Sequence, residues 1–151
     1  MDTLVFMQFD FKKRLVLEKL EEDVSAKDIL YNKHGVYGSG EHIREISKLY
    51  IQSASDIVNS LLSTYEEVGR TIEEEIVITK EAEIRAETER LALEEGERVR
   101  KDVNKISGAI IPEKMEFFTS NFLSDSRNKV EIFIGTTKRK LGNRKPKKSF
   151  S

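Results

Sequence analysis

The chain contains no cysteine, and only two prolines and eight glycines occur among its 151 residues. Without cysteine it forms neither a disulfide framework nor a thiolate metal site, so small disulfide-stapled scaffolds are excluded. Long apolar runs are also missing, because the N-terminal segment is uninterruptedly apolar only over residues 4–7. A signal peptide needs ~7–15 such residues, and a membrane span needs ~18. We therefore expect no membrane span, and a protein that stays in the cytoplasm or is assembled into a particle from there.

Core-forming residues are scarce relative to charge. Hydrophobic residues make up 38% of the chain and charged residues 35%, against a more apolar average for soluble domains. A compact chain of this length buries about 70% of its surface, which an extended rod does not reach alone. We therefore expect protein partners, either further copies in a homo-oligomer or other subunits, to supply part of the missing burial.

The net charge of −1 hides a separation of charge along the sequence. Residues 66–97 carry twelve acids against four bases, whereas residues 138–148 carry seven bases and no acid. An acidic central segment and a basic C-terminal tail therefore describe the chain better than its total charge.

A stripe of apolar residues runs through the middle of the chain at intervals of four, four and three residues. Its members, which we predict to form an association seam, are Ile46, Tyr50, Ala54, Ile57, Leu61, Tyr65, Val68, Ile72 and Ile76. The eleven-residue repeat corresponds to about 3.67 residues per turn, which keeps such a seam nearly straight. The pattern predicts one long helix over residues 41–106, a stalk on the order of 100 Å long.

A break near Gly69 is the alternative. Glycine weakens a helix, residues 71–74 match the capping-box pattern of a helix start, and the β-branched run 76–79 lowers helix propensity. The stripe nevertheless crosses this point without a change of phase, which favours a continuous helix over a kink or a helical hairpin.

The terminal segments predict a small α+β knob beside the stalk. Residues 1–40 form the N-terminal region, where alternating apolar residues from Val5 to Phe11 predict a strand. Either a second strand over residues 15–17 or a short helix over residues 12–22 follows, and a glycine-rich loop then leads to Ser39, a helix N-cap. Residues 107–135 contain a short amphipathic helix that starts at Pro112 and a second strand over 129–135. Residues 136–151 have no apolar period and are expected to be irregular. The expected fold class is therefore mainly α, with one long hendecad-patterned helix, a small knob and a basic tail.

No motif predicts catalysis, a metal or a cofactor. Gly35, Gly38 and Gly40 precede a helix, but neither a P-loop nor a dinucleotide-binding spacing is present. His34 and His42 are the only histidines, and nothing in the sequence makes three or four ligands converge on them. The many carboxylates are expected on a solvated helix face, so we expect no enzyme activity and no small-molecule substrate.

The basic tail is the best candidate for an anion-binding or acidic-partner-binding site. Its cations are Lys138, Arg139, Lys140, Arg144, Lys145, Lys147 and Lys148. They could bind nucleic acid without sequence readout by releasing counterions, dock on an acidic protein surface such as that of a neighbouring copy, or serve solubility alone.

These patterns favour a non-enzymatic structural or interaction protein that assembles through its long helix, as a component of a larger assembly such as a virion or scaffold. The alternative is a nucleic-acid-associated accessory protein that uses the basic tail.

Overall fold

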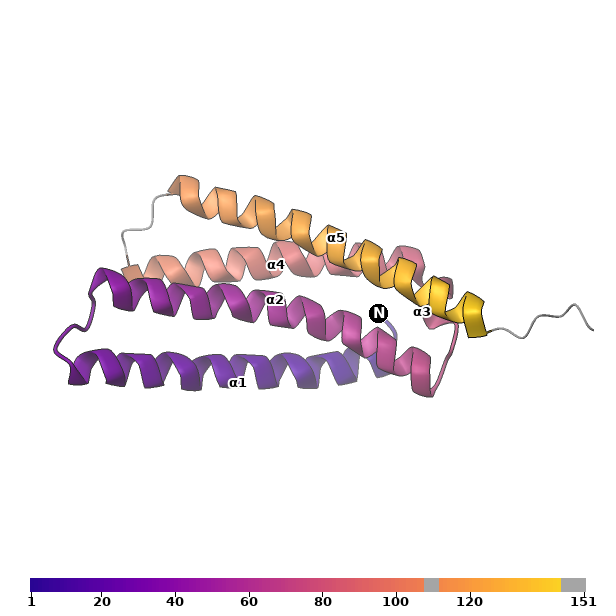
Figure 1. Ribbon diagram of the computed structural model, residues 1–151, viewed down its shortest axis with the longest axis horizontal. Helices are drawn as coiled ribbons and strands as arrows, with labels where there is room; N and C mark the ends of the chain where they lie inside the picture. Colours follow the sequence, from indigo (N-terminus) through magenta and orange to yellow (C-terminus); the bar gives the residue numbers. More distant parts are fainter. Residues whose placement is uncertain (108–111, 145–151) are drawn as a thin grey trace, which may run out of the picture.

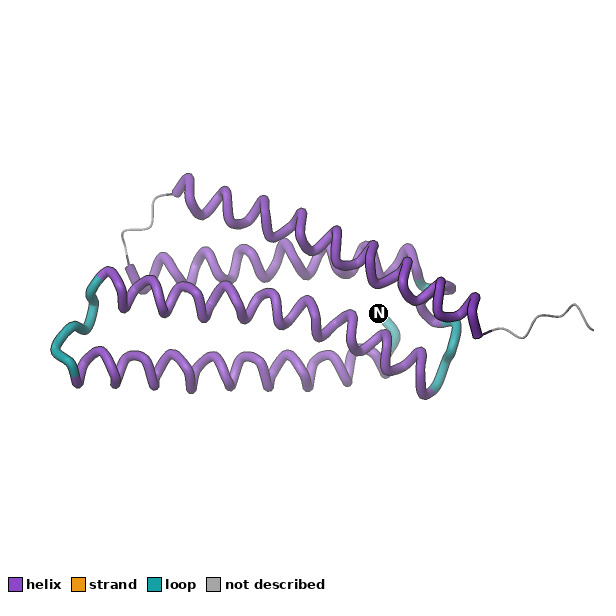
Figure 2. Tube along the Cα trace, viewed as in Figure 1, coloured by secondary structure: helices purple, strands orange, loops and turns teal. Residues whose placement is uncertain are grey.

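The computed structural model describes residues 1–107 and 112–144 and contains five helices within these ranges, with no strand (Figure 2). The helices are α1 (Thr3–Lys33), α2 (Gly40–Thr71), α3 (Ile76–Thr79), α4 (Glu81–Ser107) and α5 (Pro112–Arg144). The expectation of a mainly α protein is confirmed, whereas the expected α+β knob is absent from the described residues.

The four long helices lie side by side, and each runs antiparallel to the long helix before it (Figure 1). The central helix is α2, which packs against α1 on one side and against α4 on the other, while α5 covers α4 and contacts α2. The outer helices α1 and α5 lie on opposite sides of this pair and, over the described residues, do not contact each other. Each long helix spans roughly 40–50 Å, so the molecule is an elongated bundle rather than a stalk.

The prediction of one continuous helix over 41–106 is wrong, because the chain reverses after α2. The backbone N–H groups of Ile72 and Glu73 both donate to the carbonyl of Val68 at 2.9 Å, which ends the helix. After the turn, the Ile76 side chain returns over Gly69, where its Cγ2 lies 3.5 Å from the position of an added Cβ. The apolar phase persists across the turn because Ile76 enters the same core from the other side of the reversal, and Ile72 is 64% exposed.

The N-terminal strand prediction is also wrong, because α1 begins at Thr3. The Asp2 carboxylate caps this helix by accepting hydrogen bonds from the N–H groups of Leu4 (2.9 Å) and Val5 (3.3 Å). Val5 and Phe9 are buried, whereas Met7 and Phe11 are exposed. The alternating pattern therefore arises from a helix that is apolar on both its inner and its outer face.

In the C-terminal part, Pro112 does begin a helix, but α5 continues to Arg144 in place of the expected strand and irregular tail. Val130 and Ile134 are buried four residues apart on one helix face, and Ile132 between them is 68% exposed. Residues 145–151 of the predicted tail lie outside the described part of the chain.

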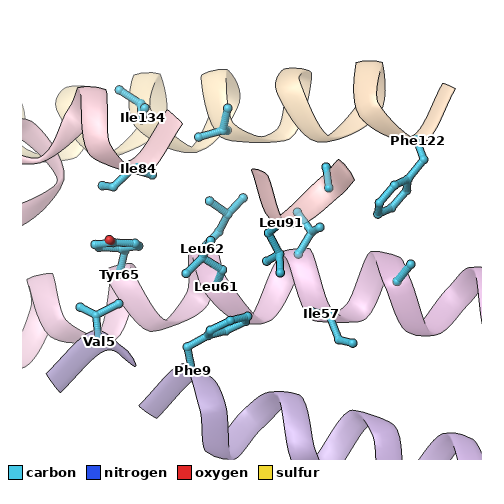
Figure 3. Packing of buried hydrophobic residues seen from close by; sticks show 14 of the residues in the cluster. Val5, Phe9, Ile57, Leu61, Leu62, Tyr65, Ile84, Leu91, Phe122 and Ile134 are labelled. Atoms are coloured by element: carbon cyan, nitrogen blue, oxygen red, sulfur yellow. The ribbon is translucent and has the colours of Figure 1, made fainter. Parts of the chain in front are cut away.

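The core lies along α2 (Figure 3). Ile57, Leu61 and Tyr65 are fully buried in it. Phe9 of α1 approaches them from one side and Leu91 of α4 from the other. One continuous apolar cluster therefore joins all four long helices.

Candidate interaction surfaces

In the folded chain, the predicted seam is the inner face of α2 over residues 46–68, followed by Ile72 in the turn and Ile76 in α3. Seven of its nine residues are buried, Tyr50 is half-buried against the core, and Ile72 is exposed at the turn. Helices of the same chain cover the buried members, so this stripe already has its packing partners within one molecule. A surface that binds other proteins must therefore be sought elsewhere on the bundle.

A buried polar network connects α2, α4 and the start of the chain. The Tyr65 hydroxyl donates a 2.7 Å hydrogen bond to Glu87, and the Met1 ammonium lies 3.0 Å from Glu87 and 3.1 Å from Glu83. Burial, together with this hydrogen bond, raises the pKa of Tyr65 far above its usual range. The two carboxylates, Glu87 foremost, raise the pKa of the terminal amine. Both groups therefore keep their protons at neutral pH and hold the helices together.

A second network crosses the bundle near its middle. Glu95 is 2% exposed and accepts a 2.9 Å hydrogen bond from Arg98. The other end of the Arg98 guanidinium donates to Ser53 of α2 at 2.8 Å, and Lys13 of α1 lies 3.9 Å from Glu95. A buried carboxylate costs free energy unless it is paired, so these partners explain how Glu95 is accommodated between three helices.

A hydrogen bond to His42 holds the glycine-rich loop in place, and the loop does not form a phosphate-binding turn. The Nδ1 atom of His42 accepts a 2.9 Å hydrogen bond from the Gly38 N–H, so Nε2 carries the proton and faces Asp28 at 2.8 Å. Gly35 and Gly38 have φ angles of 71° and 79°, which side-chain-bearing residues avoid. His34 is exposed, and no group of three or more potential metal ligands occurs within residues 1–107 and 112–144.

Ion pairs between α4 and α5 use two of the central acids that were expected on a solvated face, and one acid of α5 itself. Arg85 binds Glu131 through two hydrogen bonds of 2.6 and 3.0 Å, and Lys138 binds Glu81 at 2.8 Å. Lys138 and Arg85 lower the pKa values of Glu81 and Glu131, respectively. Arg127 also binds Glu89. Two of the twelve central acids, Glu81 and Glu89, therefore help to attach α5.

The basic residues fall into three groups. Lys138 is engaged by Glu81. Arg139 and Lys140 are exposed on α5, and neither has an acidic partner among the described residues. The other predicted members lie outside the described part, apart from the backbone of Arg144, which ends α5.

Several hollows mark the surface, and two of them are lined by residues from three helices each. One, of about 290 Å³, lies between α2, α3 and α5 and is lined by Val77, Phe133 and Leu141 among others. The other, of about 410 Å³, is a groove between α1 and α4, with Phe9 and Leu91 among its lining residues. Neither hollow brings together groups with an evident catalytic role.

The sequence patterns did not predict the outward face of α1, whose exposed residues Met7, Phe11 and Leu15 we name the outer stripe. These side chains are 63%, 63% and 49% exposed, and their spacing of four residues makes them neighbours on one helix face. The neighbouring Phe6 is 53% exposed and lines the groove beside α4. The signal was present in the sequence, because residues 4–7, 9 and 11 are apolar in every direction around a helix.

The chain has no match among family models, curated proteins or solved structures. Within the described residues, no helix is both long enough and apolar enough to cross a membrane.

Proposed function

We propose that this protein is a non-enzymatic interaction protein that takes part in a larger assembly by docking another protein surface on the outer stripe of α1. The observation that carries the proposal is the continuous line of Met7, Phe11 and Leu15 on the solvent side of a helix whose inner face is already packed. Single exposed apolar residues are common, whereas a contiguous patch marks an interaction site.

The surroundings of the stripe support this role. Asp10 and Arg14 flank it and pair with each other at 2.8 Å, and Glu18 is exposed one turn further on. An apolar centre inside a rim of polar and charged groups is the usual composition of a protein–protein interface.

The buried polar groups also support a structural rather than a catalytic reading. Tyr65, Glu87 and Glu95 have hydrogen-bond or ion-pair partners from other helices, and each is nearly or fully covered. A general acid or base must reach a substrate, whereas these groups are occupied in holding helices together.

Nucleic-acid association through the basic end of α5 is the second candidate. Arg139 and Lys140 favour it, because both are exposed, have no acidic partner among the described residues, and extend the basic sequence of residues 145–148 onto a helix. Replacement of all these cations by glutamine should abolish binding to duplex DNA of any sequence at low salt. If wild type does not bind even there, this candidate is eliminated.

The first proposal is tested by placing a photo-crosslinking phenylalanine analogue at position 11 and, as a control, at position 132. Both side chains are exposed, on outer helices that lie on opposite sides of the bundle. We expect a discrete crosslinked protein product in the expressing cell from position 11 and none from position 132. Absence of any product from position 11 would refute docking through the outer stripe.

A further inference from the structure

Building on the proposed function, we infer that the outer stripe of α1 docks on the outer stripe of a second copy of this chain. The two α1 helices pack antiparallel about a two-fold axis that passes close to residues 11 and 12. The contact is then isologous, with the same patch contributed by both copies, and it closes as a dimer.

The exposed apolar area of the outer stripe is a large share of what such a dimer requires. A standard interface buries about 800 Å² per partner, of which about 57% is apolar, or roughly 450 Å². From their exposed fractions, Met7, Phe11 and Leu15 together offer on the order of 300 Å² of apolar side chain. The remainder of the interface comes from the polar residues on either side of the stripe.

The order of residues in the stripe is self-complementary. Met7 and Leu15 lie four residues before and after Phe11, so an antiparallel arrangement places Met7 of one copy beside Leu15 of the other. The same symmetry brings the two Phe11 rings together at the axis, and aromatic pairs add about 0.5–1.5 kcal/mol beyond their buried area.

The charges beside the stripe follow the same symmetry. Asp10 and Arg14 lie on one side of it, two residues before and two residues after position 12. In an antiparallel pair the same flank of each helix meets its counterpart, so Asp10 of one copy faces Arg14 of the other. Each copy thus supplies Asp10 to one ion pair and Arg14 to an equivalent second pair, which favours a second copy over an unrelated surface.

The bundle can accept this neighbour without rearranging. Within the described residues, the backbone of α1 packs against α2 alone among the long helices, and α4 is reached by the Met1 ammonium and by side chains such as that of Lys13. A second α1 can therefore approach the outer stripe while the core residues Val5 and Phe9 stay in place, and docking of preformed surfaces needs little backbone movement.

Sedimentation equilibrium from low micromolar to near-millimolar concentration tests the inference. Wild type should show a monomer–dimer equilibrium, and Phe11→Glu should weaken dimerisation at least about tenfold. Ile132→Glu on α5 is the matched control and should leave the dissociation constant unchanged. Circular dichroism melts on dilute samples should be alike for all three proteins, since both side chains are exposed.

A charge series tests the register independently of the apolar contact. Arg14→Asp places carboxylates opposite one another and should weaken the dimer about tenfold, because like charges oppose association. Adding Asp10→Arg to that variant exchanges the two charges, restores both cross-pairs and should recover wild-type affinity. A dissociation constant that none of these substitutions changes would overturn the proposed arrangement. So would a double variant that dimerises no more tightly than Arg14→Asp.

The crosslinking experiment at position 11 separates failure of this inference from failure of the proposed function. A product of twice the chain mass of 17.4 kDa, containing only this chain, supports the dimer. A discrete product with a different protein, together with a purely monomeric chain in the centrifuge, refutes the second copy and retains docking through the stripe. No product refutes both.

Discussion

The outer helices α1 and α5 occupy equivalent places in the bundle but show different chemistry to solvent. Each covers one side of the central pair of α2 and α4. On α5, Ile132 is the one large apolar side chain exposed among residues 118–143, whereas α1 exposes the whole outer stripe and Phe6. Since α5 completes the bundle with a polar outer face, the fold does not require an apolar one on α1.

The two helices also differ in how they are attached. Helix α5 is held partly by ion pairs on the surface, such as Arg85 with Glu131, in addition to Val130 and Ile134 in the core. Helix α1 is held by Val5 and Phe9 and by its charged start, which reaches the carboxylates of α4. Core burial is therefore common to both helices, while the polar attachments titrate at opposite ends of the pH scale.

The largest expected effect concerns the inner and outer faces. Leu61 is fully buried on α2, so Leu61→Ala should lower the free energy of unfolding by about 2–5 kcal/mol through loss of burial and cavity formation. Leu15→Ala in the outer stripe should change it by only about 0.5 kcal/mol. Urea denaturation at low protein concentration measures both, and equal losses would mean that the outer stripe is part of the stabilising core.

An intermediate effect on stability is expected from the buried polar network of Tyr65, Glu87 and the Met1 ammonium. Tyr65→Phe removes a buried donor to the Glu87 carboxylate and should cost about 2 kcal/mol of stability. Tyr50→Phe is the control, because the Tyr50 hydroxyl has no hydrogen bond to another described residue. A loss at Tyr65 no larger than that at Tyr50 would show that the network does not stabilise the bundle.

The smallest expected effects are losses of the polar attachments with pH. Acid should weaken the attachment of α5, and alkali should weaken that of the start of α1. The pKa values of Glu81 and Glu131 lie below their ordinary value of 4.5, so their stabilisation is present above that pH and is lost as pH falls through the lowered values. The pKa of the Met1 amine lies above its ordinary value of 8.0, so its contribution is complete below pH 8 and is lost as pH rises through the raised value.

Hydrogen exchange of α1 and α5 across these pH ranges measures the two losses separately. Arg85→Gln should reduce the acid sensitivity of α5, and acetylation of the amine should abolish the alkaline contribution at the start of α1. If the two modifications change the exchange of both helices equally, the attachments do not act locally.

Local signals in the sequence predicted several elements correctly. Ser39 caps α2, where its hydroxyl accepts a hydrogen bond from the His42 N–H at 3.2 Å, and Pro112 begins α5. The apolar stripe correctly identified the packed face of α2, because its spacing reports which side of a helix avoids water. It could not identify what covers that face, since a partner within the chain and one from another chain produce the same pattern.

The errors arose where tertiary contacts decide. The alternation in residues 5–11 is compatible with a half-buried strand and with a helix that is apolar on two sides, and the Asp2 cap together with packing on α2 selects the helix. Pairings such as Arg85 with Glu131 join positions 46 residues apart, so no local spacing reveals them. The outer stripe became visible only once α1 was known to be helical and its inner face was known.

The first turns of α4 are contacted by Met1, which precedes α1, and by α5, because Met1 binds Glu83 and Glu87 there and Lys138 binds Glu81. Contacts between such distant parts of a chain form late, since the intervening loops must close first. The start of α4 should therefore gain its full protection from hydrogen exchange only after Met1 and the C-terminal half of α5 have packed against it. The exchange of its backbone amides should then report the last cooperative step of folding.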